Sequence, residues 1–275
     1  NTILICRILK SLKSLKSQNT ILICRILGND MPGLHGDNQT LQNLLFTLEN
    51  EADFPQTDKI YLLNRIFDVE KKTEIIKLLN KFNQKYIDIP FKIEEYNKLP
   101  EIKHIDTDTD HTNFMKESYN KNKEKMLYLV NINSARNYCV NYGRENGYLY
   151  TFPLDSNSFF LESDYNKILD DMENKTYEYI VVEQRRLSES NILSNDIVYD
   201  KNITDKLPIR EPQIGIRITA PILFNENLPY GYMNKAELLN AIGSKGAWNK
   251  WRLENYDIGF KGRRINTTII NSGKI

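Results

Sequence analysis

The chain has 275 residues, and its 37 lysines and arginines almost balance its 36 aspartates and glutamates, which leaves a formal net charge of +1. A charge this close to zero gives no overall field that would draw the protein to nucleic acid, so nucleic-acid partners are not expected. Hydrophobic residues make up 40% of the sequence, a share typical of globular domains, and no apolar run approaches the length of a membrane-spanning helix.

The beginning of the chain contains a perfect repeat. The nonapeptide NTILICRIL fills residues 1–9 and recurs at residues 19–27. One repeat does not make a solenoid, which needs several copies at a longer period. The second copy continues into the rest of the chain and is the predicted first strand. Residues 1–18 are set apart as an N-terminal extension, for which an added edge strand, a disordered tail and a duplication artefact all stay open.

The chain has three cysteines, Cys6, Cys24 and Cys139, and the first two occupy the same place in the repeated nonapeptide. Two distinct cysteine contexts make neither a disulfide framework nor a metal cluster. This content favours a reducing compartment such as the cytoplasm, while a start at Asn1 leaves room for an anchor upstream.

From residue 21 onward, apolar β-branched runs alternate with segments of helical periodicity. Strands are predicted at 21–26, 59–63, 91–93, 148–154, 177–184, 214–218 and 222–224. Helices are predicted at 40–50, 69–82, 126–146, 164–173 and 235–242. Asp68 is the expected N-cap of the second of these helices, and Gly147 and Gly243 are expected to end the third and the fifth.

Residues 95–125 are rich in Lys, Asn and Asp, and their composition predicts a mobile loop. Alternation of strands and helices with short connections predicts an α/β fold, with a mostly parallel sheet flanked by helices. We expect one domain whose part after about residue 185 is less regular.

An acidic residue stands at the end of one predicted strand. Asp155 follows the apolar run 148–154 and precedes Ser156 and Asn157. Open α/β sheets bind ligands at the carboxyl ends of their strands, so this position is a candidate site. An ordinary Asp-Ser-Asn turn is the alternative explanation.

The surrounding block is more distinctive than the acid alone. It reads Ser134-Ala135-Arg136-Asn137, then Gly147, then Asp155-Ser156-Asn157. This order resembles the central block of nucleotide-sugar-dependent glycosyltransferases with the Rossmann-like GT-A fold, especially the inverting family two. RILGND after the first strand and LLNRIFD after the second stand where that fold begins its nucleotide pocket, so the resemblance covers residues 19 to 185.

The resemblance implies a nucleotide-binding half at 19–185 and an acceptor half at 186–275. It implies a UDP- or GDP-linked sugar donor and a hydroxyl acceptor on a glycan, protein or lipid. The residues that it places around the nucleotide are Gly28, Asn29, Asp30, Asn64, Arg136, Asn137 and Asp155. Arg136 is suited to phosphate because its planar guanidinium offers a fork of donors.

The resemblance also implies a divalent metal, Mn²⁺ or Mg²⁺, held against the diphosphate by Asp155 and Asn157. The D-x-D motif of the family ends in a second aspartate, where this chain has Asn157. An amide oxygen can still bind a hard cation, but the loss of one carboxylate weakens its affinity. Metal dependence is therefore an open expectation, with Arg136 and lysine side chains as the alternative.

An inverting transfer needs a carboxylate to take the proton of the acceptor hydroxyl. Glu183, after a predicted strand, and Glu211, before another, are the candidates, and Glu211 is slightly preferred. Three other functions stay open: a nucleotidyltransferase of related topology, a catalytically inactive nucleotide- or glycan-binding module, and a structural or interaction protein.

Overall fold

The computed structural model describes residues 20–30, 35–102, 111–174, 177–185, 209–228, 234–246 and 267–270. The predicted extension 1–18 and most of the predicted acceptor half 186–275 lie outside these ranges.

Strands and helices alternate along the described part of the chain. The strands are β1 (Ile21–Leu27), β2 (Thr57–Asn64), β3 (Lys85–Ile89), β4 (Tyr150–Asp155), β5 (Tyr179–Arg185), β6 (Ile209–Arg217) and β7 (Thr267–Ile270). The helices are α2 (Gln39–Asn50), α3 (Val69–Lys81), α4 (Ile93–Asn97), α5 (His111–Val130), α6 (Ile132–Glu145), α7 (Glu162–Asn174) and α10 (Asn234–Ala241).

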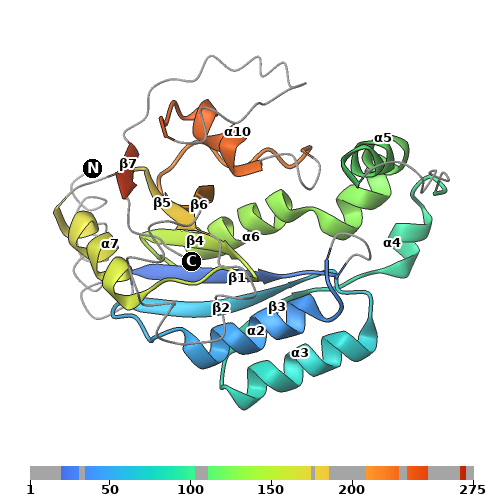
Figure 1. The fold of residues 1–275 in the computed structure, drawn as a ribbon, viewed down its shortest axis with the longest axis horizontal. Coiled ribbons are helices and arrows are strands. Elements are labelled where there is room, and N and C mark those ends of the chain that lie inside the picture. Colours follow the sequence, from blue (N-terminus) through green and yellow to red (C-terminus); the bar gives the residue numbers. More distant parts are fainter. Residues whose placement is uncertain are drawn as a thin grey trace, which may run out of the picture.

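The strands form one seven-stranded sheet in the order β3-β2-β1-β4-β6-β5-β7. Neighbouring strands are parallel except where β6 meets β4 and β5, because β6 runs antiparallel to both. Helices lie on both sides of this sheet (Figure 1). The predicted α/β class with a mostly parallel sheet is confirmed.

The central strand β1 is apolar on both faces apart from Arg25, as a strand covered on both sides must be. On one face, Leu27 packs in a cluster with Leu44 of α2 and Ile75 of α3. On the other face, Leu22 packs with Ala135 of α6. Figure 1 shows α2 and α3 below the sheet and α6 and α10 above it.

The predicted caps are confirmed. Asp68 accepts a hydrogen bond from the backbone N–H of Lys71 and so begins α3. Gly147, after α6, has a φ of +79°, and Gly243, after α10, has a φ of +71°. Both values lie in the left-handed region, where glycine is the least strained residue, which explains its use at helix ends.

Several predicted boundaries are wrong. The third strand is Lys85–Ile89 and not 91–93, while 222–224 is not a strand. The predicted loop 95–125 contains most of α4 and most of α5. The predicted helix 126–146 is two helices, because Asn131 leaves helical geometry and its side chain accepts the N–H of Ser134, which begins α6.

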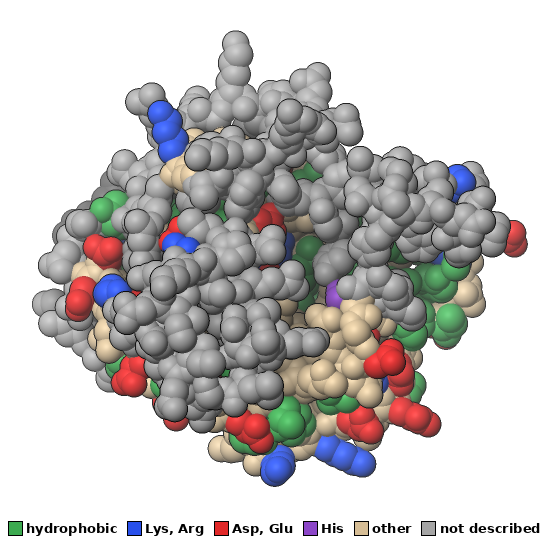
Figure 2. All heavy atoms as spheres, in the orientation of Figure 1, with side chains coloured by type: hydrophobic (Ala, Val, Ile, Leu, Met, Phe, Trp, Pro, Cys, Tyr) green, Lys and Arg blue, Asp and Glu red, His purple; other side chains and the backbone are tan. Residues whose placement is uncertain are grey.

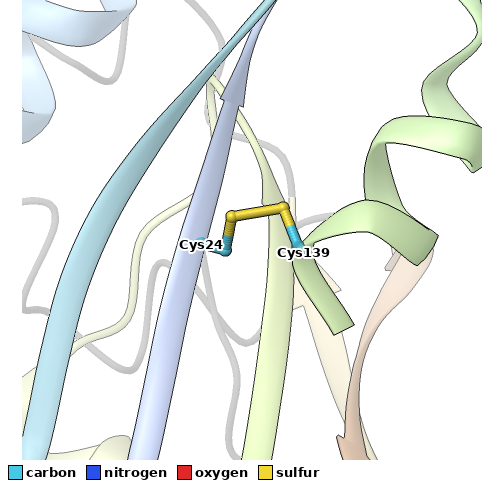
Figure 3. The surroundings of a disulfide bond; sticks show 2 residues. All are labelled: Cys24 and Cys139. Carbon is cyan, nitrogen blue, oxygen red and sulfur yellow. A yellow bond between two sulfur atoms is a disulfide. The ribbon is translucent and has the colours of Figure 1, made fainter. Parts of the chain in front are cut away.

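A disulfide joins Cys24 of β1 to Cys139 of α6, with 5.9 Å between the Cα atoms. Figure 3 shows the two side chains pointing toward each other across the strand–helix contact. The cysteine content predicted no disulfide framework, whereas one pair is joined here. The cysteines therefore no longer favour a reducing compartment. The two residues are 115 positions apart, so their pairing depends on how α6 lies over the sheet.

The surface facing the viewer in Figure 2 carries acidic and basic side chains close together on the described parts, so neither sign dominates there. Within the described ranges, no helix has both the length and the apolar character needed to cross a bilayer.

Candidate active site

The strand order reverses at β1. The chain passes from β1 to β2 and β3 on one side and then returns to β4 on the other side of β1. The parallel register pairs Leu27 with Leu63 and Ile26 with Asp155. The carboxyl ends of the three strands therefore lie along one edge, and a crevice at such a reversal is where open α/β sheets bind ligands. Gly28–Asp30, Asn64 and Asp155, predicted from separate parts of the sequence, are brought to this edge.

Asp155 ends β4 between two cations. Its Oδ1 lies 2.8 Å from Nη2 of Arg136, and its Oδ2 lies 2.6 Å from Nζ of Lys235. The Asp155 side chain is 29% exposed, whereas those of Arg136 and Lys235 are 4% and 1% exposed. Burial disfavours the charged carboxylate, but Lys235 and Arg136 hold the pKa of Asp155 well below its usual range. The carboxylate is thus ionised, fixed, and partly open to solvent.

Arg136 lies in the second turn of α6 and is held on several sides. Its Nη1 donates to Oδ1 of Asn133 at 2.9 Å. Its guanidinium lies over the ring of Phe224, 5.2 Å from the centroid. Nε is buried and has no hydrogen-bond partner in the described part of the chain, which is uncommon for a buried donor. Arg136 is therefore positioned by its surroundings but not fully satisfied by them.

Lys235 is a site residue that the sequence does not predict. Its ammonium, buried near the start of α10, also donates to Oε1 of Gln213 at 2.9 Å. The carboxylate of Glu211 accepts the backbone N–H groups of Lys235 and Ala236 at 2.9 and 3.3 Å. Glu211, a predicted general base, thus binds the first turn of α10 and lies beside the lysine that contacts Asp155.

A chain of buried polar contacts continues from Lys235 into the sheet. Gln213 donates to the hydroxyl of Ser158 at 2.9 Å. The carbonyl of Ser158 accepts Nη2 of Arg25 at 2.8 Å, and the same nitrogen lies 2.8 Å from Glu51. The edge of the sheet and its centre are joined by one network, which helps to fix the site rigidly.

The residues at the end of β1 are largely engaged within the protein. Asn29 is buried, donating to the carbonyl of Arg65 at 2.9 Å and accepting the N–H of Phe67 at 3.0 Å. It therefore ties the end of β1 to the turn after β2. Asn64 is also buried and accepts a hydrogen bond of 3.4 Å from the Arg65 side chain.

Asp30 accepts the N–H and the hydroxyl of Thr40 at 3.0 and 2.6 Å, and pairs with Lys71 at 2.8 Å. Burial acts against the charged form, but the hydrogen bonds from Lys71 and Thr40 hold the pKa of Asp30 below its usual range. Gly28 is different, because a Cβ placed on it would meet no atom of the described residues within 4 Å, its two chain neighbours apart. Its backbone thus faces space at the edge of the sheet.

Two predicted residues are engaged elsewhere. The Asn137 amide donates to the carbonyl of Phe224 and to the Glu226 side chain, and its oxygen accepts the N–H of Phe224. Asn137 therefore anchors the loop after β6 to α6. Glu183 lies on β5 and accepts from Arg185 at 3.2 Å.

The two predicted metal ligands lie in different surroundings. Both oxygens of Asp155 are engaged by cations, and Asn157 is exposed in the turn after β4. Within the described ranges, no group of three or more His, Cys, Asp or Glu residues is placed to hold a metal ion.

The topology and these contacts define an α/β protein with a polar, cation-lined edge where its strand order reverses. The chain matches no family model and no curated protein. Among solved structures, TarS from S. aureus in complex with UDP is 12% identical with a TM-score of 0.41, and the match covers 80% of this chain and 54% of that one. This chain therefore spans about half the length of the TarS structure.

Two further structures are similar. The 4-diphosphocytidyl-2C-methyl-D-erythritol synthase from Anaerococcus prevotii is 10% identical with a TM-score of 0.36, over 94% of this chain and 89% of that one. The mannosyltransferase Ktr4p from S. cerevisiae, in complex with GDP, is 17% identical with a TM-score of 0.28, over 66% and 44%. These likenesses concern the course of the backbone.

Proposed function

We propose that the protein is a glycosyltransferase that moves a sugar from a UDP- or GDP-linked donor to a hydroxyl on a glycan, protein or lipid. One observation carries the proposal: residues that resemble a nucleotide-sugar site in sequence meet at the strand-order reversal, around Asp155. A fixed ionised carboxylate, with a guanidinium beside it, suits a ligand that has both hydroxyls and phosphates.

In this proposal the donor lies across the ends of β1 and β4. The open backbone at Gly28 gives room for close approach. The exposed side of Asp155 accepts a hydrogen bond from a hydroxyl of the donor, while Arg136, held by Asn133 and Phe224, supplies positive charge near the phosphates. No step in this proposal depends on a metal ion.

The transfer itself is an in-line displacement. The acceptor oxygen forms a bond to the anomeric carbon, the bond from that carbon to the diphosphate breaks, and the diphosphate leaves with the electron pair. The hydroxyl proton goes to a carboxylate. Glu211 is the better candidate for this base than Glu183, because Glu211 lies beside Lys235 and so adjoins Asp155.

A second candidate is a nucleotide-binding module without catalysis. It is favoured by the contacts of the two candidate bases, since Glu211 accepts two backbone N–H groups of α10 and Glu183 accepts from Arg185. Hydrogen bonds of this kind stabilise the ionised carboxylate and so make it a weaker base.

The first test is a thermal-shift series with UDP, GDP, CMP, CTP and the corresponding nucleotide sugars, followed by donor hydrolysis and transfer assays. At saturation we expect UDP or GDP to raise the melting temperature by about 5 °C or more. Asp155→Asn should remove this rise, and Asp53→Asn, which changes an exposed carboxylate, should keep it.

If no nucleotide changes the melting temperature, the proposal is refuted. Binding without turnover would favour the inactive module, and turnover of CTP alone would favour a nucleotidyltransferase.

A further inference from the structure

The most unusual side chain at the candidate site is Lys235. Its ammonium is 1% exposed and lies 2.6 Å from Asp155 and 2.9 Å from Gln213. Burial of an ammonium is costly unless charged and polar partners surround it. The apolar packing of α10 does not need this residue, since Ala236, Leu238 and Leu239 make the contacts with the sheet.

The place of Lys235 along its helix is also unfavourable. The N-terminus of a helix carries partial positive charge, so acidic residues are preferred there and cations are disfavoured. Lys235 is the second residue of α10. Glu211 accepts two N–H groups of this turn and thereby offsets part of the conflict. A cation kept at a buried helix start against these costs indicates a role at the site.

That role can be read from the effect of Lys235 on Asp155. With Arg136 on Oδ1 and Lys235 on Oδ2, each carboxylate oxygen already has a cationic partner. A divalent ion at Asp155 would stand next to an ammonium and a guanidinium. The remaining lone pairs on the exposed side of the carboxylate are suited to neutral donors such as hydroxyl groups.

We propose that Lys235, together with Arg136, is a built-in replacement for a divalent metal, so that a nucleoside diphosphate binds at this edge without any metal ion. The inference rests on the proposed function. It adds that protein cations, rather than a metal ion, balance the negative charge of the diphosphate. Lys235 acts as a positioning residue: it fixes Asp155 and supplies positive charge behind it.

The experiment is calorimetric titration of the purified full chain with UDP and with GDP, in EDTA and in Mn²⁺. We expect the Kd of the bound nucleotide to agree within about twofold between the two conditions. A Kd at least tenfold tighter in Mn²⁺ would overturn the inference and leave the proposed function standing. If neither nucleotide binds in either condition, the proposed function fails as well.

The variant Lys235→Gln keeps a hydrogen-bonding side chain but removes the positive charge from Asp155. We expect its affinity in EDTA to fall about tenfold or more, and Mn²⁺ to restore part of that loss, because a carboxylate oxygen becomes free for the ion. A merely structural lysine would not produce a metal response. Unchanged affinity in EDTA, or a loss that Mn²⁺ does not affect, contradicts the role of Lys235.

Two further variants complete the series. Lys245→Gln changes an exposed lysine shortly after α10 and should bind like the parent chain in both conditions. Lys235→Arg keeps the charge and should remain insensitive to Mn²⁺, which tests the inference even if Lys235→Gln does not fold. A Lys235→Arg variant that needs Mn²⁺ would count against it.

Discussion

Arg25 and Arg136 are both buried arginines that pair with a carboxylate at 2.8 Å, but their surroundings differ. Arg25 and its partner Glu51 are 1% and 2% exposed. All three nitrogens of the Arg25 guanidinium donate hydrogen bonds, to Glu51, Tyr61 and the carbonyl of Ser158. Arg136 is just as buried, at 4% exposed, but the side chain of its partner Asp155 is 29% exposed. The first pair is closed to solvent, whereas the carboxylate of the second pair is partly open to a ligand.

The difference indicates separate roles in one polar network. A closed pair can only be broken at a cost, because removal of one partner leaves a buried charge. An open pair loses less on mutation, since solvent reaches its carboxylate, but it controls what binds there. Three changes test this contrast.

The largest effect is expected for Arg25→Met. Among the described residues Glu51 would keep only Lys59, at 3.2 Å, as a charged partner, so the free energy of unfolding should fall by about 3 kcal/mol or more. Urea unfolding measures this change. In the double variant Arg25→Met, Glu51→Leu, most of the loss should be recovered, because no uncompensated carboxylate remains.

The melting temperature of Arg25→Met should still rise when nucleotide is added, because this pair lies away from the ligand. If the single variant is within about 0.5 kcal/mol of the parent chain, the description of this pair as a closed structural contact is wrong.

A smaller loss of stability is expected for Arg136→Met, about 1–3 kcal/mol, because Asp155 retains Lys235 and contact with solvent. The nucleotide-dependent rise in melting temperature should disappear. Arg144→Met on the same helix removes a hydrogen bond to the carbonyl of Ala220 and should leave that rise intact. If Arg136→Met keeps the rise and Arg144→Met loses it, the ligand binds away from Asp155.

The smallest effect concerns pH. Since the pKa of Asp155 is lower in the folded chain, its contribution is present above the unfolded value, near pH 4, and is lost as the pH falls below it. Between pH 5 and pH 3, the parent chain should therefore lose about 1 kcal/mol more stability than Asp155→Asn. Urea midpoints at several pH values measure the difference, and parallel curves would argue against a lowered pKa.

Much of the fold can be predicted because β1, β2 and β4 each contain a mainly apolar run, as buried parallel strands do. β3 escapes prediction because Lys85–Ile89 is largely exposed at the edge of the sheet and mixes polar with apolar residues. The start of α5 resembles a loop in sequence because its segment is polar, and sequence periodicity has little to detect there.

The site can be predicted only where it is local. Asp155 and Arg136 are 19 residues apart in a block with a recognisable order, but Lys235 is 80 residues beyond Asp155. In the sequence, Lys235 is one lysine at the start of a short amphipathic helix. Its burial results from the way α10 meets β6 and β4, which depends on tertiary packing. The pairing of Cys24 with Cys139 also depends on tertiary packing, so the sequence does not predict it.

The repeated nonapeptide gives β1 a further meaning. Residues 1–9 have the same sequence as 19–27. The first copy therefore contains the same residue types that β1 uses for its contacts, including those of Arg25 with Glu51 and of Cys24 with Cys139. The side chains of the two copies are therefore equally suited to the central strand position. The residues after each copy differ: Lys10-Ser11-Leu12 in one case and Gly28-Asn29-Asp30 in the other. Only the second copy is followed by the turn that borders Asp155. The nonapeptide therefore encodes the central strand, whereas the residues after it encode this part of the site.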